Sequence, residues 1–233
     1  MISSTSWQPL ICPHLKFESP LRVLFSGVAE HSTLGSQFRY LEYPTATSRS
    51  GRCLMLIHVR QALGGDHASI LEIARSLHPQ WFSELGIKDI ARDLQVERGL
   101  IAEDDGKAVG FLIYCAKDNR TAELSWIGVR PELHRKGIGR ALVNALEASL
   151  VQSGFQSLEV STVAATTEDE SYARTRTFYR AVGFSDVQVD VKWFSSGDDR
   201  LLLRKPLSSQ ARMPEVCRSR MTPEGVNGTT TGT

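Results

Sequence analysis

One segment, residues 124–142 with the sequence LSWIGVRPELHRKGIGRAL, constrains the fold of this chain more than any other. An apolar stretch that predicts a strand runs into a loop with Gly137 and Gly139, where a helical apolar pattern begins. Glycines let backbone N–H groups approach a bulky anion, and a helix start adds unsatisfied N–H groups and the positive end of the helix dipole. The segment predicts an anion site, although a glycine-rich turn with solvated cations would have the same spacing.

Charge in the segment supports the anion site. Arg130, Arg135, Lys136 and Arg140 face a single acid, Glu132, whereas the whole chain has a net charge of only +1. With no overall basic field, and no apolar run near the roughly 20 residues of a membrane span, we expect no nucleic-acid and no membrane partner. The segment does not match a dinucleotide-binding loop, because Leu142 replaces the third glycine of that motif. It does not match a nucleoside-triphosphate loop either, because the GK[ST] ending is missing.

The pattern around this segment predicts an α/β (α+β) fold with helices on both faces of one sheet. We expect strands at 54–60, 99–102, 108–116, 122–129, 157–163, 187–193 and 201–205, and helices at 66–77, 87–94, 137–153 and 172–182. Asp66 is the expected N-cap of the first helix.

Composition divides the chain into three parts. We expect residues 1–52, rich in serine and threonine, to be a poorly ordered extension, residues 53–206 to be the folded domain, and residues 207–233 to be a flexible tail. The four cysteines are scattered, with no CxxC pair and no metal-ligand spacing, so we expect reduced thiols, no metal and a cytoplasmic protein.

Two motifs carry a resemblance to a known family. His134-Arg-Lys-Gly137-Ile-Gly139 resembles the acyl-coenzyme A loop of the GNAT superfamily of N-acyltransferases, whose pattern is Arg/Gln-x-x-Gly-x-Gly/Ala. The segment 178–184, FYRAVGF, resembles the second signature of that superfamily. His134 departs from the usual Arg or Gln, and Tyr172 and Thr175 stand where Asn and Ala are common.

The resemblance covers residues 53–206 and implies a mostly antiparallel sheet of about seven strands flanked by about four helices. It also implies an N-acetyltransferase that moves an acetyl group from acetyl-CoA to a primary amine by direct attack in a ternary complex. The residues it assigns to acetyl-CoA are Ile127, Gly128, Val129, Arg135, Lys136, Gly137, Ile138, Gly139 and Arg140.

The resemblance assigns two catalytic residues. Glu123 is the candidate base that deprotonates the amine; strand alternation would place it on the same face as Val129, six residues later. It is equally a polar residue facing solvent, with water carrying the proton instead. Tyr179 is the candidate acid that protonates the departing thiolate, or else a core aromatic beside Phe178.

The acceptor is less constrained. The acids 168–170 would attract a cationic amine or simply favour the start of a helix, and Trp81-Phe82 would line an acceptor pocket or belong to the core. A non-catalytic acyl-CoA sensor or scaffold of the same fold is the alternative function. The identity of the amine and the oligomeric state are not determined by the sequence.

Overall fold

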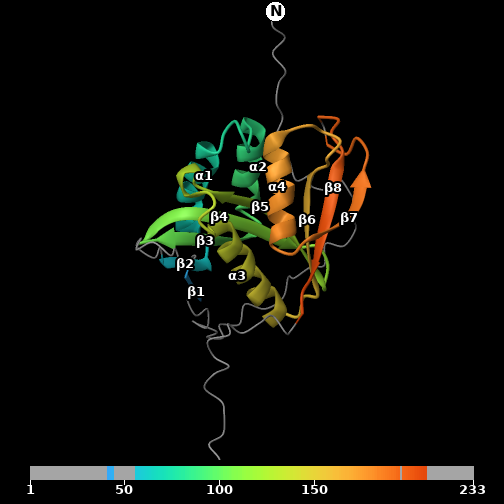
Figure 1. Ribbon diagram of the computed structural model, residues 1–233. Helices are drawn as coiled ribbons and strands as arrows, with labels where there is room; N and C mark the ends of the chain where they lie inside the picture. The colour runs from blue at the N-terminus through green and yellow to red at the C-terminus, as the bar shows by residue number, and fades with distance from the viewer. Residues whose placement is uncertain (1–40, 45–55, 195, 209–233) are drawn as a thin grey trace, which may run out of the picture.

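A single mixed sheet organises the chain, and the computed structural model describes residues 41–44, 56–194 and 196–208 (Figure 1). The strands lie in the order β1-β2-β3-β4-β5-β6-β8-β7, and every neighbouring pair is antiparallel except β5 and β6. The strands are β1 (Leu41–Pro44), β2 (Leu56–Gln61), β3 (Arg98–Asp104), β4 (Lys107–Ala116), β5 (Thr121–Val129), β6 (Ser157–Val163), β7 (Ser185–Asp190) and β8 (Arg200–Pro206).

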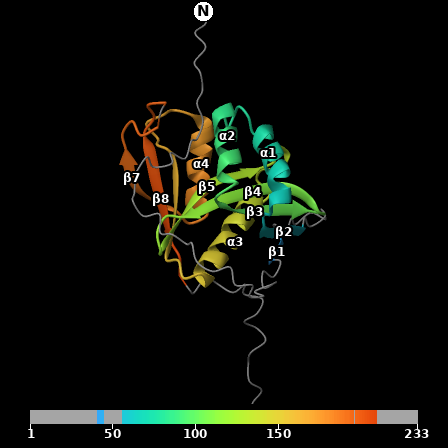
Figure 2. The same ribbon diagram turned by 180° about the vertical axis from the view of Figure 1, so that it is seen from behind.

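Four α-helices cover the sheet, namely α1 (His67–Ser76), α2 (Glu84–Asp93), α3 (Ile138–Gln152) and α4 (Glu170–Ala181). Views from opposite sides show them in two layers (Figures 1 and 2). One apolar core joins α3 and α4 to the sheet, and a second joins α1 and α2 to it. The expected mixed, mostly antiparallel α/β fold with helices on both faces is confirmed.

The described residues contain one strand more than the sequence pattern predicts. Strand β1 pairs with β2 from Leu41 opposite Val59 to Pro44 opposite Leu56, and it lies before the expected domain start at residue 53. The rest of the expected extension and the tail beyond residue 208 lie outside the described residues. The domain boundaries therefore stay a prediction.

The start of α1 and the end of α4 differ in how they are capped. Asp66 stands at the start of α1, but its carboxylate makes no capping bond there; it pairs with Arg60 at 2.7 Å instead. Gly183 follows α4 with a φ of +99°, and the Phe184 N–H donates to the Tyr179 carbonyl, the ending that a glycine just after a helical pattern favours.

Strands β5 and β6 pair along only their first halves. The pairing runs from Thr121 opposite Ser157 to Leu124 opposite Val160, although β5 continues to residue 129 and β6 to residue 163. The two strands therefore separate beyond Leu124, and the facing backbone edge of β5 is left without a strand partner among the described residues.

A β-bulge marks the point of separation. Trp126 pairs with Ile113 on β4 and Leu124 pairs with the next residue, Tyr114, so Ser125 is the extra residue. Leu124 consequently belongs to the core under α3 and α4, whereas Trp126 belongs to the core under α1 and α2. Side chains before and after the bulge thus exchange faces of the sheet.

A buried carboxylate ties β6 to its neighbours below this opening. Glu159 is 2% exposed and accepts hydrogen bonds from Lys117 at 2.7 Å and from Arg204 at 2.8 Å. Burial raises the pKa of Glu159, but the hydrogen bonds from Lys117 and Arg204 outweigh burial and hold the pKa below its ordinary value. The ionised carboxylate therefore stabilises the fold.

We expect Glu159→Gln to lower the free energy of unfolding at pH 7 by about 2 kcal/mol, the range of hydrogen bonds to a charged group. Because the folded pKa is depressed, this stabilisation is complete above the unfolded pKa of about 4.3 and is lost as pH falls through the folded pKa. Urea unfolding from pH 7 to pH 3 should show the two proteins converging. Asp186→Asn, which breaks an exposed pair with Arg180, is the control with an expected loss below about 1 kcal/mol. Equal losses in both variants would contradict the account.

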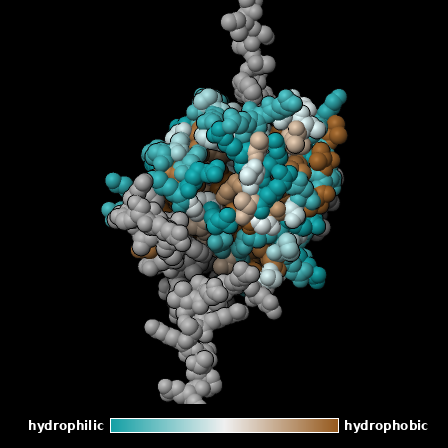
Figure 3. Space-filling model, in the orientation of Figure 1, coloured by the Kyte–Doolittle hydropathy of each residue, from teal (hydrophilic) through white to brown (hydrophobic). Residues whose placement is uncertain are grey.

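The surface is mostly hydrophilic, with exposed apolar side chains at the edge strand β7 and just beyond it (Figure 3). These are Val187, Val189 and Val191, each about half exposed or more. In the described part of the chain, no helix has the length and apolar character needed to cross a membrane.

Candidate active site

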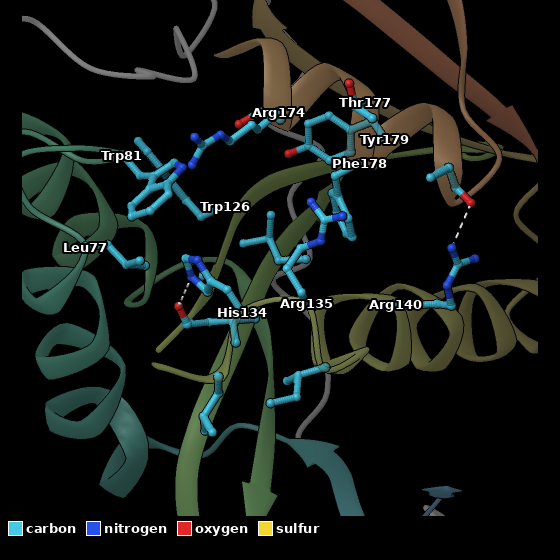
Figure 4. A pocket seen from close by; sticks show the side chains of 18 of the residues that line it. Leu77, Trp81, Trp126, His134, Arg135, Arg140, Arg174, Thr177, Phe178 and Tyr179 are labelled. Atoms are coloured by element: carbon cyan, nitrogen blue, oxygen red, sulfur yellow. Dashed lines mark hydrogen bonds between the residues drawn. The ribbon is translucent and has the colours of Figure 1, made fainter. Parts of the chain in front are cut away.

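A cavity of about 770 Å³ occupies the opening between β5 and β6. Its walls are the separated part of β5, the loop before α3, one side of α4 and the segment after α1 (Figure 4). The residues that contribute include Leu77, Trp81, Phe82, Ser125, Trp126, Ile127, Gly128, Val129, His134, Arg135, Gly137, Ile138, Gly139, Arg140, Ser161, Glu170, Arg174, Thr177, Phe178 and Tyr179.

The loop at one end of the cavity is shaped to bind an anion. Arg135 and Gly137 both have left-handed backbone, with φ of +64° and +87°, and α3 begins at Ile138. Among the described residues, no backbone carbonyl accepts from the N–H groups of residues 135–140. Successive free N–H groups at such a turn and at a helix start form an anion site. The loop thus has the geometry that its glycines and charge predict.

Only part of the expected charge cluster faces this loop. Arg135 and Arg140 line the cavity, and Arg140 also donates to the Ala181 carbonyl of α4 at 3.0 Å. Lys136 is exposed and does not line the cavity. Arg130 turns away, because it binds Glu72 at 2.7 Å and the Ala108 carbonyl at 2.9 Å. Fewer cationic side chains therefore surround the cavity than the sequence predicts.

Close packing brings α4 onto this loop. A Cβ atom on Gly139 would lie 3.2 Å from the ring of Phe178, closer than most side chains approach one another. A larger residue would push the start of α3 away from α4. The absence of a side chain at Gly139 therefore lets the loop before α3 lie close to the helix that carries Tyr179.

Tyr179 is a core aromatic that also belongs to the cavity wall. It is 5% exposed, and its ring lies 5.5 Å from that of Phe178 and 5.7 Å from that of Phe184. It also lines the cavity, with its hydroxyl directed to the side where Trp126 and Arg174 lie (Figure 4). The interpretation as a core aromatic is therefore confirmed, and the role of Tyr179 as an acid stays a prediction.

The structure places Glu123 differently from the simple alternation of a strand. Leu124 faces the core under α3 and α4, and Ile127 and Val129 pack against that same core. Glu123, next to Leu124, points to the opposite face, so it does not share a face with Val129. The bulge at Ser125 is the physical reason. Glu123 does not line the cavity and lies on the side of the sheet that α1 and α2 cover.

The other end of the cavity is aromatic. Trp81, Phe82 and Trp126 line it, and Phe82 also packs edge-on against Trp126 at 5.9 Å. Phe82 thus belongs to the core and Trp81 packs against it, and both line the cavity; that this end receives the acceptor stays a prediction. The side chain of Arg174 extends from α4 toward the two tryptophans (Figure 4).

The acids before α4 have separate roles. The Asp169 carboxylate caps the helix by accepting from the Tyr172 N–H at 3.0 Å, as the helix-start interpretation predicts. Glu170 lines the cavity and pairs with Arg174 at 2.5 Å. Sequence reasoning missed Arg174 and Thr177. Their signal is the spacing 170, 174, 177 and 181, which places residues on one face of a helix.

His134 replaces the Arg or Gln that is usual in the family motif. It links the loop before α3 to β5 by a hydrogen bond. Its Nε2 donates to the Val129 carbonyl at 2.8 Å, and its ring lies edge-on to Trp81 at 4.9 Å. The ring of His134 therefore contacts protein groups on β5 and beside α1, and it also lines the cavity. Sequence spacing alone could not show this bond, because it depends on the path of the loop.

We expect His134→Ala to weaken CoA binding about fivefold, because the loss of one hydrogen bond of about 1 kcal/mol loosens the loop. His134→Gln retains an N–H donor and should stay within twofold of wild type. Calorimetric titration with CoA measures both variants. A His134→Gln protein as weak as His134→Ala would show that the histidine ring itself, rather than its bond to Val129, matters.

Comparisons with known proteins agree with this arrangement. The family model described as the acetyltransferase (GNAT) family matches residues 68–184. No curated protein matches the chain. Several solved structures share the fold. A GNAT-family protein from Desulfovibrio desulfuricans has 23% identity and a TM-score of 0.58, covering 65% of this chain and 99% of its own.

Two further structures are similar. The ribosomal-protein-S18-alanine N-acetyltransferase from Escherichia coli has 22% identity and a TM-score of 0.54, over 65% of this chain and 94% of its own. A GNAT-family acetyltransferase from Elizabethkingia anophelis, solved with acetyl-CoA bound, has 16% identity and a TM-score of 0.51, over 65% and 98%. With the family model spanning half of the sequence, the chain belongs to the GNAT family of acetyltransferases.

Proposed function

We propose that the protein is an acetyl-CoA-dependent N-acetyltransferase that transfers acetyl to a primary amine by direct attack in a ternary complex. One observation carries the proposal: the loop of residues 135–140, whose N–H groups have no backbone acceptor among the described residues, lies at a cavity that extends along the unpaired edge of β5 to Tyr179. Acetyl-CoA has the matching parts, namely a pyrophosphate, an arm with amide groups and a thioester. The Elizabethkingia anophelis relative holds acetyl-CoA.

The backbone N–H groups from Arg135 to Arg140 would hold the pyrophosphate, with the guanidinium groups of Arg135 and Arg140 beside it. The arm would lie along Ile127, Gly128 and Val129, whose edge faces the cavity instead of β6. From Val129 back to Ser125 the strand rises about 13 Å, which carries the arm from the loop to the bulge. The thioester would then lie between the β5 edge and Tyr179.

The reaction forms a C–N bond and breaks the C–S bond of the thioester. The amine, with an ordinary pKa of about 10, must lose a proton to attack the carbonyl carbon. A backbone N–H of Gly128 or Val129 would stabilise the oxyanion that develops. The departing thiolate would take a proton from the Tyr179 hydroxyl. Because Glu123 lies on the opposite face from Val129, we propose that it receives the amine proton through water rather than directly.

Calorimetric titration of the full chain with CoA, acetyl-CoA and pantetheine tests the cofactor assignment. CoA and acetyl-CoA should bind, and pantetheine, which lacks the pyrophosphate, should bind at least 100-fold more weakly. Arg130→Gln, at a cation outside the cavity, is the matched control and should bind CoA as wild type does. No binding of CoA, or equal affinity for pantetheine, would contradict the proposal.

A further inference from the structure

A buried carboxylate lies behind the aromatic end of the cavity. Asp93, the last residue of α2, is 0% exposed, and its Oδ2 accepts a hydrogen bond from Trp126 Nε1 at 2.8 Å. Its Oδ1 lies 3.1 Å from Nε of Arg92, whose side chain is more than half exposed. The indole of Trp126 is itself 3% exposed. Helix α2 is thus bonded to β5 directly after the bulge.

Stability alone does not explain a carboxylate at this position. Removing a polar side chain from water is unfavourable, and an apolar pair of similar volume commonly serves a core equally well. A neutral acceptor would also satisfy one indole N–H. The bond from Trp126 does more than satisfy a buried acceptor, because it also restricts the orientation of the indole ring.

The ring held in this way is part of the cavity wall. Trp126 follows the bulged Ser125 and precedes Ile127 and Gly128, whose backbone edge faces the cavity. It packs against Phe82 on one side and lines the cavity at the end toward which the Tyr179 hydroxyl is directed (Figure 4). Any rotation of the indole would change the shape of the cavity at that end and the backbone next to it.

We infer that Asp93 is a positioning residue: it fixes the Trp126 indole, and through it the wall and the β5 edge that receive the acetyl group. This inference rests on the proposed function, which places the thioester between β5 and Tyr179. Asp93 itself does not line the cavity, so it acts through Trp126 and not by contact with a substrate. Its effect should therefore be confined to the acetyl end of the cosubstrate.

The test compares the affinities of full-length Asp93→Leu, Asp93→Asn and Trp126→Phe for acetyl-CoA and for CoA. Asp93→Leu and Trp126→Phe should each weaken the binding of acetyl-CoA about tenfold, as expected for the loss of one buried hydrogen bond, and the binding of CoA less than twofold. Asp93→Asn keeps a carbonyl oxygen that can accept from the indole, so it should stay within threefold for both. The double variant Asp93→Leu/Trp126→Phe should lose no more than Trp126→Phe alone, because the two residues act through one bond.

Three outcomes would overturn the inference. Acetyl-CoA affinity unchanged in Asp93→Leu would show that the bond does not shape the acetyl end, and equal weakening of CoA and acetyl-CoA would show a general structural role. Asp93→Asn, which should fold, keeps the test valid even if Asp93→Leu unfolds: a tenfold loss in that variant would also contradict it. A wild-type protein that binds neither compound would instead refute the proposed function.

Discussion

Tyr179→Phe is expected to lower kcat for acetyl transfer at least 100-fold while leaving the affinity for acetyl-CoA within twofold of wild type. General acid catalysis contributes about 10²- to 10⁴-fold, and the substitution removes only the hydroxyl that the reaction would use. The phenylalanine ring keeps the contacts of Tyr179 with Phe178 and Phe184, so the fold and the cavity should persist. Steady-state rates of thiol release and calorimetry with acetyl-CoA measure the two effects separately.

Tyr114→Phe is the matched control for this prediction. Tyr114 is also a buried tyrosine in the core under α3 and α4, but it does not line the cavity. Its loss should leave kcat unchanged. A kcat for Tyr179→Phe within threefold of wild type would assign the protonation of the thiolate to another group or to water.

Gly137→Val is expected to weaken binding of both CoA and acetyl-CoA at least 50-fold. The φ of +87° at Gly137 is unfavourable for a β-branched residue, so the loop would change its path and its N–H groups would no longer converge. The loss should appear equally with the two ligands, because the pyrophosphate is common to both. Calorimetric titration measures this directly.

Gly154→Val is the matched control for Gly137→Val. It distinguishes the loss of the loop geometry from the general effect of a valine at a position with left-handed backbone. Gly154, which follows α3, has a nearly identical φ of +84°, lies in open space and does not line the cavity. The two variants should lose similar stability, as measured by urea unfolding, but only Gly137→Val should lose ligand affinity. Equal loss of affinity in both would mean that the conformation of the loop is not what binds the anion.

The sequence predicts the geometry of the loop before α3 well because glycines and a helix start determine its backbone. Glycines at 137 and 139 specify a left-handed turn and a close helix contact, and both are present in the structure. Helix and strand positions follow from apolar periodicity in the same way. Side-chain charge was a poorer guide, since Arg130 belongs to the apparent cluster but binds Glu72 on another part of the surface.

The face of Glu123 could not be predicted because a bulge leaves no mark in the alternation of apolar residues. Leu124 and Trp126 are both apolar and both buried, as an unbroken strand would require, yet they face different cores. Only the register against β4 reveals the extra residue at Ser125. The sequence pattern could not show the hydrogen-bond partner of Trp126 either, because Asp93 lies in a helix that is distant in sequence.

Thiol release from acetyl-CoA by the full chain, measured with small amines, polyamines and lysine peptides, tests the central claim most directly. The account predicts release that depends on the amine for at least one of these classes, recovery of the N-acetylated amine by mass spectrometry, and loss of both in Tyr179→Phe. Tight binding of acetyl-CoA with no amine-dependent release across the panel would contradict the claim of catalysis and favour a protein that holds acyl-CoA without turning it over.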